Sequence, residues 1–152
     1  MPGAPARQAW SALVAAYFSV LADLVKRLEA EAGMDSGRFS ALAFLDRAPV
    51  RGRMRLSELH DAMRHRYSQP GLSRLVQRME RDGLVVRRTD PDDGRAALVV
   101  TTRHGRARYR KANEVYLDAL AEHFGRHLEG DEAAQLTAVL ERLVARRNAD
   151  RD

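Results

Sequence analysis

The sequence of 152 residues contains no cysteine, and this absence excludes several classes of protein. Without thiols there can be no disulfide bond, no thiolate ligand for a metal ion and no thiol-based redox sensor. Lysine is also scarce, since only two lysines accompany 24 arginines. The cysteine count therefore excludes a disulfide scaffold, and the fold must be predicted from the pattern of the other residues.

Long apolar runs are missing too. None approaches the roughly 20 residues that a membrane-spanning helix needs. The opening sequence MPGAPARQ lacks the charged and apolar regions of a signal peptide, and its first six residues are predicted to be disordered. We therefore expect a cytoplasmic protein that does not engage a membrane.

The motifs of common enzymes are absent from the sequence. It has no Gly-x-Ser-x-Gly elbow, no phosphate-binding glycine loop and no His-Glu-x-x-His. His123 and His127 stand four residues apart on a predicted helix, a spacing that can hold a metal, but no third ligand is near in sequence. We expect no catalytic residue, no metal site and no cofactor, and we interpret the two histidines as part of a solvated helix face.

The charge of the chain is concentrated in one stretch. Residues 51–110 hold 15 Arg and 7 Asp or Glu, a balance of +8, whereas the rest of the chain has a balance of −3 and the whole chain +5. A basic segment within a neutral-to-acidic chain is the pattern expected of a protein that binds a polyanion.

The segment 68–83 is predicted to be an amphipathic helix within this basic stretch. Its apolar residues Leu72, Leu75, Val76 and Met79 recur at i, i+3, i+4 and i+7. Arg, Gln and Ser occupy the opposite side, which suits the DNA major groove because Arg pairs with guanine and Gln with adenine. For this helix alone, a solvated basic face is an equally good interpretation.

Three further elements surround this helix. Residues 56–63 form a shorter predicted helix before it, and residues 84–88 and 97–101 form two short β-branched strands after it. The strands flank a turn of Asp, Pro and Gly, residues 89–95, and residues 54–56 are the candidate for a third strand. Helix, turn, recognition helix and wing follow in the order of a winged helix-turn-helix.

The fold class predicted is therefore mainly α with a small β-wing. Helices are expected at about 8–32, 36–47, 102–128 and 131–147, outside the helix pair and the wing. We divide the chain into an N-terminal dimerisation helix (1–34), a winged helix-turn-helix domain (35–109) and C-terminal dimerisation helices (110–152). The apolar faces of the terminal helices are wide, which favours packing against a second copy over closing a monomeric core.

The winged segment resembles the MarR (multiple antibiotic resistance regulator) family of bacterial transcription factors. Three pieces carry the resemblance: the helix pair LSELHDAM and SQPGLSRLVQRMERDGLV, the wing DPDDGRA, and the exit VVTTRHGRA. The family's wing typically reads Asp-Pro-x-Asp-Arg-Arg. Asp93 and Arg95 keep its main pair, and Gly94 replaces the first Arg, which removes one charge.

The resemblance and the chemistry of the residues together predict the contacts. Arg95 should reach the DNA backbone or minor groove, steadied by a salt bridge from Asp93, as the resemblance implies. The early turns of a recognition helix go deepest into the groove, and the later arginines serve phosphates or salt bridges. The candidates for base edges are Ser68, Gln69, Ser73, Arg74 and Gln77, and those for phosphates or salt bridges are Arg78, Arg81, Arg87 and Arg88.

Regulation by a small ligand is a weaker expectation that also comes from the resemblance. Members of the family often bind aromatic or phenolic compounds between the dimer helices and the DNA-binding lobe. Aromatic residues at helical spacing could line such a crevice here, although aromatic residues in this pattern are more often part of the core. These residues are Trp10, Tyr17, Phe39, Phe44, Tyr109 and Tyr116.

Three functions remain open from the sequence. The favoured one is a homodimeric, sequence-specific regulator that binds a palindromic operator in double-stranded DNA, a repressor relieved by a small effector, for which an aromatic compound is the candidate. The second is an architectural DNA-binding protein that is indifferent to sequence. The third is a winged helix that binds proteins, which the clustered arginines and the Asp93–Arg95 wing disfavour.

Overall fold

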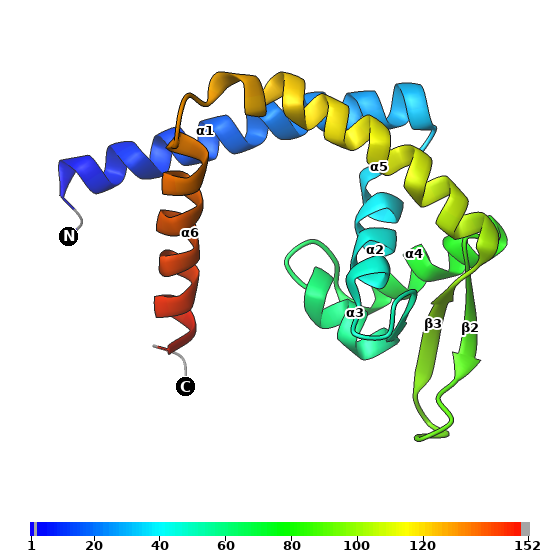
Figure 1. The fold of residues 1–152 in the computed structure, drawn as a ribbon. Coiled ribbons are helices and arrows are strands. Elements are labelled where there is room, and N and C mark those ends of the chain that lie inside the picture. The colour runs from blue at the N-terminus through cyan, green and yellow to red at the C-terminus, as the bar shows by residue number, and fades with distance from the viewer. Residues whose placement is uncertain (2, 150–152) are drawn as a thin grey trace. The chain divides into compact units, whose positions relative to one another are not determined.

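The computed structural model describes the backbone of residue 1 and residues 3–149, and it divides into two compact units. We call residues 25–116 the winged unit, and the described parts of 1–24 and 117–152 the terminal unit. Figure 1 shows the course of the chain. The domain boundaries expected after residues 34 and 109 stay predictions.

Three α-helices lie wholly within the winged unit, which also holds η1 (Leu28–Ala32) and the start of α5 (Arg103–His123). The three are α2 (Ser36–Arg47), α3 (Leu56–Met63) and α4 (Gln69–Arg81). The Asp35 carboxylate accepts the Gly37 and Arg38 N–H groups and so caps α2, and the N–H group of Arg55 before α3 donates to Glu58. The helices predicted at these places are confirmed.

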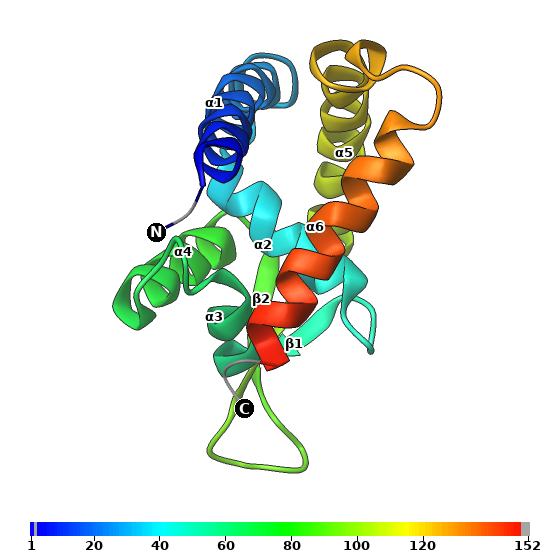
Figure 2. The same ribbon diagram turned by 90° about the vertical axis from the view of Figure 1, so that its left-hand side faces the viewer.

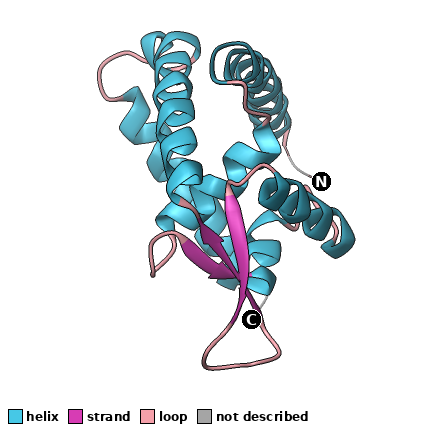
Figure 3. Cartoon of the chain, turned by 90° about the vertical axis from the view of Figure 1, so that its right-hand side faces the viewer, coloured by secondary structure: helices cyan, strands magenta, loops and turns pink. Residues whose placement is uncertain are grey.

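The wing is part of a three-stranded antiparallel sheet in the order β1-β3-β2 (Figure 3). The strands are β1 (Arg53–Arg55), β2 (Val85–Thr89) and β3 (Ala97–Thr101). Val99 of the central strand lies opposite Met54 on one side and Arg87 on the other. The third strand predicted before α3 is therefore confirmed, one residue earlier than expected.

The core of the winged unit lies between these helices and the sheet. All four apolar positions predicted for the recognition helix are buried, with exposed fractions of 0–1%. Leu59 and Met63 of α3 are buried to the same degree, and Val85 and Val99 cover them from the sheet. In Figures 1 and 2, α3 and α4 lie side by side above the loop of the wing. Burial of one face leaves the other face of α4 open.

The remaining helices begin and end the chain. They are α1 (Ala4–Arg27), which continues as the π-helix η1 (Leu28–Ala32), then α5 (Arg103–His123), the 3-10 turn η2 (Gly125–His127) and α6 (Glu132–Ala149). Gly33, with φ 58°, ends the first of them as predicted.

Two expectations about these helices are wrong. Residues 4–6 are helical, because Pro5 stands in the first turn, where its missing N–H costs no hydrogen bond. The α5 helix ends at His123 rather than Leu128, because Phe124 takes a non-helical conformation (φ −131°, ψ −59°) and the next residues form a 3-10 turn.

The terminal unit leaves much of its apolar surface uncovered. Trp10, Phe18, Val139 and Val144 are 50–65% exposed within the chain. By length and composition alone, Ala4–Ala32 could also cross a membrane, with a mean hydropathy of 1.4 in its most apolar window. The sequence was expected to hold no such stretch. A core helix of a soluble protein passes the same test, but only 6% of this window is buried inside the chain.

Candidate nucleic-acid interface

The open face of α4 carries the side chains proposed to read base edges. Ser68 precedes the helix and its hydroxyl oxygen accepts the Gly71 N–H at 3.3 Å, so it acts as the N-cap. Gly83, with φ 69°, follows the C-cap Asp82 and terminates the helix. Ser73 is half-buried, and the exposed side chains are Gln69, Arg74, Gln77, Arg78 and Arg81.

The turn between α3 and α4 is fixed against the start of α2. The Arg66 guanidinium donates to the hydroxyl oxygens of Ser36 at 2.9 Å and Ser40 at 3.2 Å. The Tyr67 hydroxyl lies directly over Gly37, so that a Cβ at this position would overlap it. These contacts hold the angle at which α4 leaves α3.

The far end of α4 is fixed by an arginine that the sequence analysis did not single out. The Arg38 Nε donates to Asp82 at 2.9 Å, and the same guanidinium pairs with Asp35. Burial raises the pKa of the Asp35 carboxyl, but the backbone and side-chain hydrogen bonds from Arg38 outweigh it and the pKa is lowered. The N-terminus of α2 therefore contacts both ends of the recognition helix.

The base of the wing rests on a buried carboxylate, Asp90, that the sequence analysis also missed. Asp90 is 5% exposed, and its carboxylate accepts the Asp92 N–H at 2.9 Å and the Arg55 Nε–H at 2.6 Å. The hydrogen bond from Asp92 and then the one from Arg55 lower the pKa of Asp90. An Asp before Pro in a turn is a signal for the first bond, but nothing in the sequence pointed to Arg55.

The predicted salt bridge between Asp93 and Arg95 is not what the structure shows. The Asp93 carboxylate accepts the backbone N–H of Arg95 at 3.1 Å, and within the described residues it forms no ion pair with the Arg95 guanidinium. The turn brings the backbone N–H two residues on within reach of the carboxylate, which leaves the guanidinium exposed at the wing.

A groove joins the start of α4 to the wing. It encloses about 530 Å³ and brings together three of the predicted DNA-binding residues, Gln69, Ser73 and Arg95. Neither Arg74 nor Gln77 lines it. The groove residues besides the three named are Leu56, Ser57, His60, Pro70, Leu72, Ala96 and Ala97.

The two arginines of β2 differ in whether they are paired with a carboxylate of the protein. Arg87 is half-buried and pairs with Glu80 of α4, its Nε lying 2.7 Å from the carboxylate, which also accepts the Arg87 N–H at 2.9 Å. Arg88 is exposed and lines a hollow of about 310 Å³ together with Arg95. Arg87 therefore takes the salt-bridge alternative, and Arg88 is open to a phosphate.

The six aromatic residues expected to line a ligand crevice fall into both units. Phe39 packs against Tyr109 and Tyr116, with ring centroids 5.7 and 4.9 Å apart, and Phe44 packs against the same core. Trp10 and Tyr17 belong to the terminal unit and are 65% and 57% exposed. Their role in ligand binding stays a prediction.

The sequence is similar to proteins of a known family. Residues 32–96 match the model of the MarR family, a span that includes α4, β2 and the wing loop and ends before β3. The chain is 31% identical over 93 residues to the homoprotocatechuate degradative operon repressor of Escherichia coli. This match covers 60% of the chain and 62% of that relative, so the chain spans less than two thirds of the relative's length.

Solved structures resemble the chain over nearly its whole length. AbsC, a MarR family transcriptional regulator from Streptomyces coelicolor, has a TM-score of 0.84 at 25% identity, covering 98% of each chain. Sco3205, a MarR family regulator from the same organism solved in complex with DNA, has a TM-score of 0.80 at 26% identity and covers 95% of this chain and 89% of its own. The predicted mainly α fold with a β-wing is confirmed.

Proposed function

We propose that the chain is a transcriptional regulator of the MarR family, which the match over residues 32–96 and the likeness to solved members support, and that it is a homodimeric DNA-binding protein that represses transcription from a specific operator. The observation that carries this proposal is the groove in which Gln69, Ser73 and Arg95 meet. It combines amide and hydroxyl groups, which suit base edges, with a guanidinium that suits a phosphate or the minor groove.

The electrostatics of the winged unit support binding to DNA. Along the open face of α4, Arg74, Arg78 and Arg81 are exposed, and Arg88 and Arg95 extend this positive surface to the wing. Among the acidic groups nearby, Glu80 pairs with Arg87 and Asp90 with Arg55, which leaves Asp92 and Asp93, exposed at the wing, against these five arginines. A phosphate backbone would therefore meet mostly uncompensated cations.

The terminal unit supports a two-fold dimer. Its exposed aromatic and aliphatic side chains form a larger uncovered apolar surface than a monomer in water normally shows. A second copy is the occupant that the function requires, because a palindromic operator presents two half-sites about one helical turn apart. The Sco3205 regulator is a related protein that was solved with DNA.

Relief by a small ligand is the least supported part of the proposal. The relative from Escherichia coli is named as the repressor of a degradative operon, and such a repressor has to be released when the compound to be degraded is present. The six aromatic residues named above stay our candidates for ligand contacts. A regulator of this kind would act in the cytoplasm, where the DNA is.

The test is a selection of DNA from a pool of random duplexes, followed by competition. We expect a selected sequence with two symmetric half-sites, bound about 10³-fold or more tightly than duplex of scrambled order at the same salt concentration. A ratio below about tenfold would favour the architectural alternative, in which the basic face binds without reading sequence.

A further inference from the structure

A second cleft in the winged unit is lined by four arginines and four other residues. It lies between the end of α2, the turn before β1 and the first three turns of α5, and it encloses about 560 Å³. The arginines are Arg51, Arg103, Arg106 and Arg110, and the rest of the lining is the buried Tyr109 with Asp46, Asn113 and Glu114. Its volume lies within the range of small-molecule sites.

The positive charge of this cleft is only partly balanced. Three of its arginines follow one another at i, i+3 and i+7 along α5, so they share one side of the helix. Asp46 is already paired with Arg51, whose Nε lies 2.9 Å from the carboxylate. Within the described residues, neither Arg103 nor Arg110 forms an ion pair with a carboxylate. An anion would therefore find unpaired guanidinium groups.

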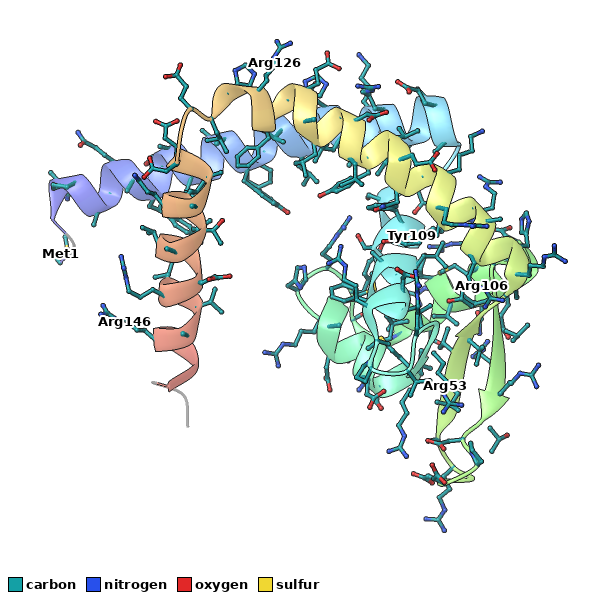
Figure 4. The ribbon with its side chains drawn as sticks, viewed as in Figure 1. Met1, Arg53, Arg106, Tyr109, Arg126 and Arg146 are labelled. Carbon is teal, nitrogen blue, oxygen red and sulfur yellow. The ribbon has the colours of Figure 1, made fainter. Side chains whose placement is uncertain are left out.

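The cleft is separate from the groove at α4, so DNA bound in that groove would not explain the charges of the cleft. The cleft adjoins the start of α5, which follows β3, whereas the wing tip precedes β3. Figure 1 shows the wing tip and the start of α5 at opposite ends of the hairpin, and Figure 4 labels Arg106 and Tyr109 near the α5 end. Five residues of strand separate them, about 17 Å at 3.4 Å per residue.

The arginines and the tyrosine of the cleft are donors that suit an anion, and of its two carboxylates Asp46 is already paired while Glu114 stays in the lining. Arg106 already donates to the Thr101 carbonyl oxygen at 2.9 Å, which fixes its guanidinium beside the cleft. Burial raises the pKa of Tyr109, so its hydroxyl is protonated at neutral pH and can donate. Guanidinium groups bind carboxylates and phosphates through paired N–H donors.

We propose that this cleft binds a small molecule carrying an oxyanion, a carboxylate or a phosphate ester, through Arg103, Arg106 and Arg110. The proposal concerns a site apart from the groove at α4, and it does not rest on the proposed function. Binding can be measured on the free protein, so a failure here and a failure of DNA recognition would be distinguishable.

The test titrates the intact protein with inorganic phosphate and, separately, with benzoate at constant ionic strength. Calorimetry and backbone amide shifts should show saturable binding of one or both, with the largest shifts between residues 103 and 114. A response to phosphate alone would assign a phosphate ester, and a response to benzoate alone a carboxylate. The double variant Arg103→Gln/Arg110→Gln should weaken binding about tenfold or more.

The matched control is Lys111→Gln, which removes one positive charge from the same helix at an exposed position outside the cleft. It should leave binding within about twofold of the intact protein. Equal weakening by the control, or no saturable binding of either probe, would overturn the proposal. So would a salt slope for DNA binding reduced by about 2 in the double variant only, because the arginines would then be DNA phosphate contacts.

Discussion

The two units of this protein differ in how they use their apolar residues. The winged unit places nearly all of its large apolar side chains in one core, between three helices and the sheet. The terminal unit buries only Leu24 and Ala119 among its described hydrophobic residues, and leaves aromatic rings exposed. A region with a complete core can keep its shape alone, whereas one without a core needs another chain to cover it.

The same contrast holds for the polar groups. In the winged unit, ion pairs join elements that are far apart in the sequence, such as Arg38 with Asp82 and Arg55 with Asp90. In the terminal unit, the hydrogen bonds along α6 are local, such as the Gln135 amide with Asp131, and the contact of His123 with Asp23 of α1 is long, at 3.6 Å. The winged unit is thus built to hold one geometry, which a protein that reads base edges requires.

The largest expected effect comes from removing α6. Deletion of residues 132–152 should lower affinity for a selected palindromic duplex by about 100-fold or more, because a chain that cannot pair grips one half-site at a time. Affinity for scrambled DNA should change much less. Deletion of residues 150–152 is the control, and competition binding measures both. If both deletion variants kept specific binding equally, the terminal unit would not be needed for pairing of two chains, and the comparison between the units would be wrong.

The next effect tests whether the winged unit has a fixed core. A Cβ at Gly105 would overlap the carbonyl oxygen of Leu84, which stands between α4 and β2. The start of α5 can therefore pack against Leu84 only if residue 105 has no Cβ. Gly105→Ala should lower the free energy of unfolding by about 3 kcal/mol in urea titrations. Gly94→Ala is the matched control, since nothing lies within 4 Å of its Cβ, and it should change stability by less than about 0.5 kcal/mol. Similar stabilities of the two variants would show that this junction is not tightly packed.

A substitution in α4 distinguishes a contact with a base edge from a contact with a phosphate. Arg74→Ala should cost about 1–3 kcal/mol on the selected duplex and relax the preference at one base pair per half-site. Repeating the selection with the variant measures that preference. If selected and scrambled duplexes lose the same affinity, Arg74 is a phosphate contact.

A smaller effect is expected at the wing. Arg95→Ala should weaken binding to all duplexes alike and reduce the slope of log K against log salt by about 1, since one phosphate contact is lost. Arg142→Ala removes an exposed arginine from the terminal unit and should leave the slope unchanged. Equal slopes for the two variants would remove Arg95 from the DNA interface.

The smallest effect concerns acid stability. The pKa of Asp90 is lowered, so its stabilising contribution is complete above the ordinary pKa of about 3.9 and is lost as the pH falls through the lower folded value. Asp90→Asn should therefore show a shallower loss of stability below about pH 4 than the unchanged chain. Thermal unfolding followed across pH 2–6 gives both profiles, and parallel profiles would contradict the role of Asp90.

The sequence predicted local structure well, because periodicity and capping are local signals. Ser68 and Gly83 mark the two ends of α4, and the apolar stripe between them is buried as predicted. The predicted end of α5 was wrong because Leu128 continues the apolar pattern beyond Phe124, where the backbone leaves the helix. Periodicity reports which residues are apolar, not where the backbone turns.

The sequence could not reveal the long-range partners. With 24 arginines and 21 acidic residues, composition allows many pairings, and only the folded chain selects Asp90 for Arg55 or Glu80 for Arg87. The same limit explains the wing, where Asp93 was assigned the Arg95 guanidinium and instead accepts its backbone N–H. The open face of α4 was predictable, but not the contacts that hold it in place.

The most direct test of the division between the units is the mass of the protein in solution, free and on DNA. Sedimentation equilibrium at micromolar concentration should give twice the chain mass of 17.1 kDa, and two chains on each selected duplex. A free mass of one chain, combined with tight binding of one chain to an intact palindrome, would contradict the account. The uncovered apolar surface of the terminal unit would then need another explanation, and the winged unit would have to recognise the whole operator alone.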